Sequence, residues 1–222
     1  MTTIQENGVG VATVLKHTEI GRGSQFVNTI KDSHCYVVDT NRWHEYERGC
    51  WTPVDQKAVQ GRAMDFIKDE APRIAQMIDD RDREETTAEY RRYANKAGVN
   101  NLTQLASVEL RAKVEDFDTD DHAICADNGW INLKDGRLRQ HDPNKRFSMT
   151  CAAAFAADRA APLWHKTVGE VFNGNIDLMT YFQRVVGYSI LGGNSEQVLF
   201  ICHGAGANGK SLLLETIKNV PF

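Results

Sequence analysis

The chain is poor in proline and contains no long apolar run. Only 5 of its 222 residues are proline, while 41% are hydrophobic and 25% are charged. This composition excludes collagen-like, mucin-like and wholly disordered polymers. No segment approaches the roughly 18 apolar residues of a membrane span, and the opening MTTIQENGVGVATV lacks the basic and apolar regions of a secretory signal. We therefore expect a globular protein of the cytoplasm that does not associate with membranes.

Cysteine pairs at metal-binding spacing are also missing. The five cysteines are widely separated, and no two of them form a C-x-x-C pair. Such cysteines are typical of reduced thiols in a reducing compartment. Neither a disulfide framework nor a zinc site is therefore expected.

Charge of one sign does not dominate. The chain has 26 Lys and Arg residues against 30 Asp and Glu residues, a formal net charge of -4. A nucleic acid would therefore have to be bound by a local basic surface and not by bulk charge.

The first part of the chain changes character after about residue 30. Residues 1–30 contain four glycines and little apolar periodicity, so a flexible N-terminal segment is predicted. Two stretches rich in β-branched or aromatic residues, 35–39 and 42–47, flank the polar pair Thr40-Asn41. This pattern predicts a β-hairpin.

Three aromatic residues lie in and just after the predicted hairpin. Trp43, Tyr46 and Trp51 lie close together in the sequence. Local core is the favoured interpretation, and a platform on which nucleic-acid bases stack is the alternative.

The stretch from residue 56 to residue 114 is predicted to be helical. Residues 56–79 show helical apolar spacing that Pro72 should kink or split. In residues 79–96, carboxylates precede arginines by three or four positions, as on a solvated helix. A further helix is expected from Asn101 to about Val114.

Strand character returns after an acidic linker. Residues 131–133 and 137–139 flank Lys134-Asp135-Gly136, and this arrangement predicts a second hairpin.

Two more helices are expected over 161–174 and 175–193, the second capped by Asn175 and ended by Gly192-Gly193. The most basic window of the chain is a candidate phosphate-contacting surface that contains Lys134, Arg137, Arg139, Lys145 and Arg146.

The strongest functional pattern lies near the end of the chain. Residues 204–211 satisfy G-x-x-x-x-G-K-[ST], the phosphate-binding loop of nucleotide-binding proteins. The apolar run Val198–Cys202 predicts a buried parallel strand before the loop, and residues 211–220 predict a helix after it. The candidate nucleotide-binding residues are Gly204, Ala205, Gly206, Ala207, Asn208, Gly209, Lys210 and Ser211.

The physical basis of this pattern is anion capture. Glycines allow backbone N–H groups and a helix N-terminus to approach phosphates closely. Lys210 is expected to neutralise the β- and γ-phosphates of ATP as the candidate catalytic residue, and the Ser211 hydroxyl to bind Mg²⁺. A glycine-rich turn that binds nothing is the alternative.

Catalysis by such a loop needs further parts. ATP hydrolysis also requires a carboxylate for the metal ion and the attacking water, and an arginine for the transition state. Only eleven residues follow Ser211, so we expect either the N-terminal part of a longer ATPase or a shortened remnant. Whether this chain is itself an enzyme stays open.

The order of these features resembles the phage and plasmid DNA primase-helicases whose motor is a superfamily 3 helicase. The resemblance covers about residues 30–222. It rests on Asn128-Gly129, Asp135-Gly136, residues 141–143, 182–188 and 195–197, and on the G-x-N-G-K-S form of the loop. Walker B, sensor and arginine-finger segments and a recognisable N-terminal primase domain are not found.

The resemblance implies an α+β chain with three parts. Residues 1–30 would be a flexible segment, and residues 31–174 a mainly helical, poxvirus-type collar domain with small β-hairpins. Residues 175–222 would begin an AAA+-like P-loop α/β ATPase domain. The family assembles as a ring, usually a hexamer, that moves along single-stranded DNA with ATP and Mg²⁺ in the bacterial host cytoplasm, alongside other replication proteins.

Three functions remain open from the sequence. The first is an ATP-binding component of a replicative DNA helicase or primase-helicase. The second is a non-catalytic module that oligomerises or docks replication proteins and carries a vestigial loop. A small-molecule kinase is the third, and it is disfavoured because some 200 residues precede the loop.

Overall fold

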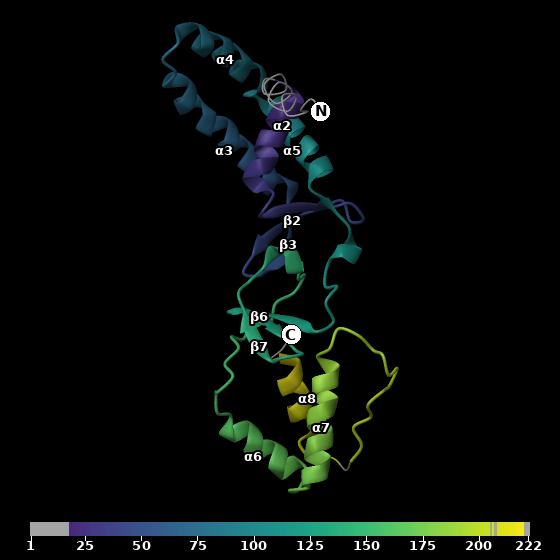
Figure 1. Cartoon of the computed structure of the whole chain (residues 1–222). Helices are drawn as coiled ribbons and strands as arrows, with labels where there is room; N and C mark the ends of the chain where they lie inside the picture. Colours follow the sequence, from purple (N-terminus) through teal and green to yellow (C-terminus); the bar gives the residue numbers. More distant parts are fainter. Residues whose placement is uncertain (1–17, 205, 207, 220–222) are drawn as a thin grey trace, which may run out of the picture. The chain divides into compact units, whose positions relative to one another are not determined.

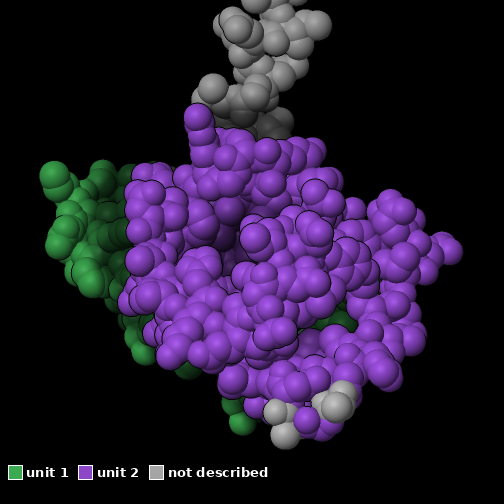
Figure 2. All heavy atoms as spheres, turned by 90° about the horizontal axis from the view of Figure 1, so that it is seen from below, with its two compact units in different colours: residues 1–47, 52–116 green, residues 48–51, 117–222 purple. Residues whose placement is uncertain are grey.

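The computed structural model describes residues 18–204, 206 and 208–219. It divides the chain into two compact units, coloured green and purple in Figure 2: unit 1 comprises residues 1–47 and 52–116, and unit 2 residues 48–51 and 117–222. The described residues form seven α-helices and two small sheets (Figure 1). This mixture confirms the expected α+β class.

A four-stranded sheet has the strand order β3-β2-β1-β4. It belongs to unit 1 except for Cys50 and Trp51 of its edge strand β3, which fall in unit 2. The strands are β1 (His34–Val37), β2 (Arg42–Glu47), β3 (Cys50–Val54) and β4 (Arg111–Ala112). β1 and β2 are antiparallel with Tyr36 opposite Trp43, whereas β1 and β4 are parallel. Asn41 has a φ of 52°, a left-handed conformation that asparagine tolerates in tight turns. The hairpin predicted around this residue is therefore confirmed.

Four capped helices complete unit 1. They are α2 (Glu19–Ile30), α3 (Gln56–Ala75), α4 (Asp80–Tyr93) and α5 (Lys96–Glu109). A side-chain oxygen before each helix accepts a hydrogen bond from an N–H group of the first turn, which the helix itself leaves unsatisfied. The caps are Thr18, Asp55, Asp79 and Asn95. The buried core comprises Phe26, Val27, Ile30, Trp43, Val59, Ala63, Ile67, Leu102 and Ala106.

Helix α2 lies where the sequence predicts a flexible segment. Residues 1–17 of that segment are outside the described residues, but the part that follows is helical and packs against α5 (Figure 1). Phe26 and Ile30, one turn apart, are both buried. A Cβ atom at Gly23 would lie 2.8 Å from Leu105 Cδ1. This glycine therefore permits close packing of two helices and does not mark flexibility.

The boundaries of two other helices differ from the sequence prediction. Pro72 does not split α3, which continues through it and ends at Ala75. A proline removes the hydrogen bond to the carbonyl four residues earlier, and near the end of a helix this loss affects only the last turn. α5 begins at Lys96 and not at Asn101, because Asn95 caps it. The charged helix predicted over 79–96 is confirmed as α4.

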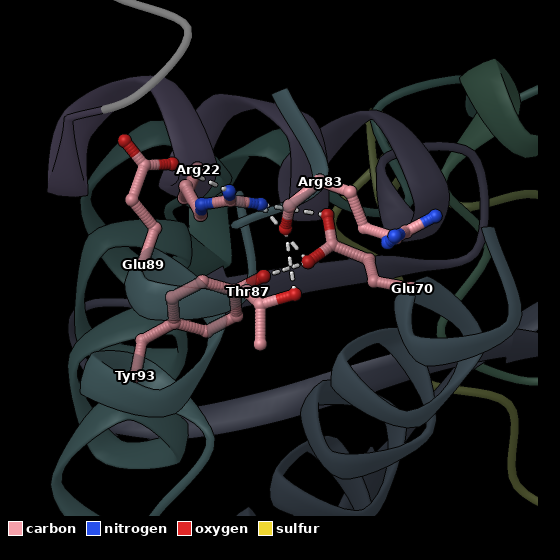
Figure 3. A network of polar contacts seen from close by, with 6 residues as sticks. All are labelled: Arg22, Glu70, Arg83, Thr87, Glu89 and Tyr93. Atoms are coloured by element: carbon pink, nitrogen blue, oxygen red, sulfur yellow. Dashed lines mark hydrogen bonds and ion pairs between the residues drawn. The ribbon is translucent and has the colours of Figure 1, made fainter. Parts of the chain in front are cut away.

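A polar network joins α2 to α3 and α4 (Figure 3). Arg22 Nη1 donates to Glu70 Oε1 at 2.7 Å, and Arg22 Nη2 lies 3.3 Å from Glu89 Oε2. The guanidinium lies over the Tyr93 ring, 4.3 Å from its centroid, and the Tyr93 hydroxyl donates to Glu70. Burial raises the pKa of Glu70 above its ordinary value although Arg22 opposes the shift, because desolvation disfavours a carboxylate.

Unit 2 begins with a three-stranded antiparallel sheet. Its strands are β5 (Ala123–Ala126), β6 (Gly129–Asn132) and β7 (Arg137–Arg139), in the order β5-β6-β7. Gly136 has a φ of 66° in the turn between β6 and β7, and the predicted second hairpin is therefore confirmed. The small core beside this sheet comprises Cys50, Cys125, Trp130 and Phe147.

Three helices follow in unit 2: α6 (Pro162–Val171), α7 (Ile176–Ser189) and α8 (Lys210–Asn219). The helices predicted over 161–174 and 175–193 are thus confirmed. Asn175 caps α7 as expected, since its Oδ1 accepts the Leu178 N–H at 3.0 Å. α7 ends at Ser189, short of the glycine pair predicted to end it.

The strand predicted at Val198–Cys202 does not form. These residues have no regular secondary structure, and the side chains of Leu199 and Ile201 are 85% and 80% exposed. A parallel strand is stable only when neighbouring strands pair with its backbone and cover its faces. No described strand pairs with this segment, so the prediction of a buried strand is wrong for the described structure.

Candidate functional site

The candidate loop leads directly into helix α8. Six of its eight residues are described, whereas Ala205 and Ala207 lie outside the described residues. α8 begins at Lys210, and the Leu213 N–H donates to the Gly209 carbonyl at 3.1 Å. The loop therefore ends at a helix N-terminus, where backbone N–H groups favour a bound anion. The helix predicted after the loop is confirmed.

The fold requires glycine at position 209. Its φ is +79°, and a Cβ atom there would lie 2.5 Å from Val171 Cγ2 at the end of α6. A side chain would therefore meet both backbone strain and a steric clash. The sequence identifies Gly209 by pattern, but only the structure reveals Val171 as its neighbour.

Gly206 is different, because no contact with a described residue excludes a side chain there. A Cβ atom at this position would meet no described atom within 4 Å. Packing of the described residues does not account for a glycine here. A ligand that approached the backbone closely would account for it, since a side chain would hold the ligand away.

The ammonium group of Lys210 lies over the loop. Its Nζ donates to the Gly204 carbonyl at 3.1 Å and to Asn208 Oδ1 at 2.6 Å. The charge is thus held among the loop residues, where phosphate oxygens would approach. The sequence pattern leaves position 208 undefined, and the structure gives Asn208 the role of a partner for this lysine.

Ser211 is exposed in the first turn of α8, next to Lys210. Mg²⁺ prefers six oxygen ligands and usually takes several of them from water and phosphates. In the described part of the chain, no group of three His, Cys, Asp or Glu side chains could hold a metal ion. The Ser211 hydroxyl is chemically able to supply one oxygen ligand of this kind.

An apolar cavity of about 520 Å³ lies beside the loop. It is bounded by α7, by α8 and by residues 199–203, and Lys210 forms part of its wall. The Tyr188 ring packs against the Phe200 ring with their centroids 6.1 Å apart. The Tyr188 hydroxyl accepts a hydrogen bond from the Glu196 N–H at 3.0 Å. These contacts attach the segment before the loop to α7 in the absence of strand pairing.

The predicted basic surface is partly neutralised by its own neighbours. Lys145 Nζ lies 2.7 Å from Asp120 Oδ2, and Arg139 Nη2 lies 2.6 Å from Asp135 Oδ2. The hydrogen bond from Lys145 holds the pKa of Asp120 below its ordinary value. Both cations also lie over the Trp130 ring. Lys145 Nζ is 4.3 Å from the centroid of this ring, and Arg139 Cζ is 5.5 Å from it. Contact with phosphates by this window stays a prediction.

The two tryptophans of the aromatic cluster predicted in and after the first hairpin are both buried. Trp43 is 3% exposed and belongs to the core of unit 1. Trp51 is 5% exposed in unit 2, where its Nε1 donates to the Pro143 carbonyl at 3.0 Å. Burial favours the interpretation of both indoles as core.

Comparison with known proteins identifies one family. The family described as D5 N terminal like matches residues 23–173. No curated protein matches the chain. Among the described helices, none combines the length and the apolar character that crossing a bilayer requires. Because the match covers more than half of the 222 residues, the chain belongs to the D5 N terminal like family, the N-terminal region of D5-like primase-helicase proteins of DNA replication.

Proposed function

We propose that the chain is an ATP-binding component of a primase-helicase of DNA replication, such as that of a phage or plasmid. Residues 204–211 would bind Mg-ATP. In the assembled ring, a hexamer, hydrolysis would drive movement along single-stranded DNA. Family membership supports a role in DNA replication, and the loop supplies the ATP-binding part of the proposal.

One observation carries the nucleotide-binding proposal. Lys210 is both the first residue of α8 and the residue whose ammonium lies over the loop, bound to Gly204 and Asn208. A phosphate at this place would meet the helix N-terminus and a positive charge together. Such charge-assisted hydrogen bonds are about twice as strong as neutral ones.

The chemistry beyond binding would require groups outside this loop. The loop would orient the phosphates and neutralise them, while the bound metal ion would supply Lewis-acid chemistry at the γ-phosphate. The carboxylate for the metal ion and the arginine for the transition state would come from other parts of the ring.

A docking module without catalysis is the second candidate. The observation that favours it is a set of large apolar side chains in unit 2 that are at least 74% exposed. They are Leu163, Ile176, Leu199 and Ile201. Exposed apolar groups of this kind are typical of surfaces that contact another protein. In this case the chain would self-associate whether or not ATP is present.

Calorimetric titration of Mg-ATP separates the two candidates. The variants are Lys210→Ala and, as a matched control, Lys218→Ala, which removes an exposed lysine from the last turn of the same helix. We expect the wild type and the control to bind alike and Lys210→Ala to bind at least about tenfold more weakly. No binding by the wild type, or equal binding by all three, would contradict the nucleotide site.

A further inference from the structure

A polar cavity of about 800 Å³ lies entirely within unit 1. It is bounded by the β1–β2 hairpin, by the connection from β3 to α3 and by one face of α5. Its volume falls in the range of small-molecule sites, about 300 to 1,000 Å³. Neither the candidate loop nor the basic window of unit 2 contributes to it.

One wall of the cavity carries a fixed aromatic ring. Tyr36 is half-buried, and its ring packs edge-on against the buried Trp43 ring. The two ring centroids are 5.3 Å apart, and the angle between the ring planes is 64°. Its hydroxyl donates to Asn41 Oδ1 at 3.4 Å. The ring is thus held from two sides while it still lines the cavity, and a nucleic-acid base can stack on such a surface with little loss of side-chain entropy.

Side-chain amides line the opposite part of the cavity. Asn100 and Gln104 lie one turn apart on α5, and Gln56 begins α3. Asn100 Oδ1 accepts a hydrogen bond from Gln60 at 3.0 Å, which leaves its N–H₂ group as a donor. The side chains of Gln56 and Gln104 form no hydrogen bond with any described residue. An amide offers a donor and an acceptor side by side, which matches the edge of a base.

The rim of the cavity carries a positive charge. Arg42 lies at the start of β2, and its side chain is exposed. Its backbone pairs with Val37 in the sheet, but its guanidinium forms no hydrogen bond or ion pair with any described residue. Asp55 also lines the cavity, but its carboxylate caps α3 by accepting the Lys57 N–H at 3.2 Å. Arg42 can therefore meet a phosphate without giving up an existing partner.

We propose that this cavity binds one unpaired nucleotide of a single-stranded nucleic acid. The base stacks on Tyr36, the amides of Gln104 and its neighbours meet the edge of the base, and Arg42 contacts the adjoining phosphate. The inference deepens the DNA-binding part of the proposed function, and it does not depend on the loop at residues 204–211. A free nucleotide has the same chemistry, so the test must separate the two sources.

Fluorescence anisotropy of labelled oligo(dA) and oligo(dT), with the full chain at low salt, tests the proposal. We expect Tyr36→Leu to weaken binding roughly 5- to 150-fold, whereas Tyr36→Phe keeps the ring and the affinity. Arg42→Ala should weaken binding and reduce the slope of log K against log[salt] by about 1. Arg81→Ala, which removes an exposed arginine of the same unit that does not line the cavity, should change neither.

Additional variants and a competition experiment complete the test. If thermal unfolding shows that Tyr36→Leu is not folded, Gln104→Ala and Arg42→Ala replace it, since both residues are exposed. If dAMP or dTMP displaces the oligonucleotide only at concentrations far above that of the oligonucleotide, the site belongs to a strand. If either displaces it at equal concentration, the site belongs to a free nucleotide.

Equal oligonucleotide affinity of Arg42→Ala, Gln104→Ala and Arg81→Ala, or no binding of either ligand by the wild type, overturns the proposal. Lys210→Ala should bind oligonucleotides like the wild type, so failure of the loop is distinguishable from failure of the cavity.

Discussion

Lys210 Nζ lies 2.6 Å from Asn208 Oδ1, so the lysine of the candidate loop is held by a neutral acceptor within the loop. A neutral partner positions the ammonium without cancelling its charge. We predict that Asn208→Asp weakens Mg-ATP binding at least about tenfold, because a carboxylate would pair with the lysine and repel the phosphates. Calorimetry checks this, with Asn208→Ala as the control that removes the contact but adds no charge. Wild-type affinity in Asn208→Asp would exclude a phosphate beside this lysine.

The two loop glycines at 206 and 209 should respond differently to alanine. Gly209→Ala is expected to lower stability by about 1 to 3 kcal/mol, because its φ is positive and Val171 occupies the space. Gly206→Ala should leave thermal unfolding unchanged, since nothing lies within 4 Å, yet weaken Mg-ATP binding about tenfold. Thermal unfolding and calorimetry on both variants measure the contrast. Undiminished ATP binding by Gly206→Ala would leave this glycine without a ligand-based explanation.

Local features of the fold could be predicted from the sequence. The turn at Asn41, the turn at Gly136 and the cap at Asn175 each depend on a few neighbouring residues. The start of α8 likewise follows from the spacing of the loop. These signals are local because backbone conformation and capping are decided within one turn of chain.

Features that depend on distant residues could not be predicted. The strand expected at Val198–Cys202 has the right residue types but no partner among the described strands. Trp43 and Trp51 are close in sequence, yet they are buried in different units. The cavity over Tyr36 is assembled from residues up to 71 positions apart in the sequence, from Tyr36 to Ser107. Sequence spacing carries no signal for such assemblies.

Gly23 and Gly61 provide a matched test of helix packing in unit 1. Both lie within helices, but a Cβ atom at Gly23 would be 2.8 Å from Leu105, whereas Gly61 has nothing within 4 Å. We predict that Gly23→Leu lowers the free energy of unfolding by about 1 to 3 kcal/mol through overpacking. Gly61→Leu should raise it by up to about 1 kcal/mol, because leucine favours a helix more than glycine does. Chemical denaturation measures both, and stabilisation by Gly23→Leu would contradict the packing of α2 on α5.

The polar network of Arg22 should make stability depend on pH through Glu70. Burial raises the pKa of this carboxyl in the folded state, so the folded protein binds the proton more tightly than the unfolded chain. The stability contributed by this group is therefore fully present below its unfolded pKa, roughly 4.3, and is lost as the pH rises through the folded pKa.

Glu70→Gln cannot ionise and should lack this component. We predict that the free energy of unfolding of the wild type, relative to that of Glu70→Gln, falls as the pH rises from about 4 toward 7. Denaturation at several pH values measures the difference, with Glu84→Gln as the control for removing an exposed carboxylate from α4. If the difference between wild type and Glu70→Gln instead grows with pH, attraction by Arg22 outweighs burial, and the Glu70 carboxylate is a net stabilising charge.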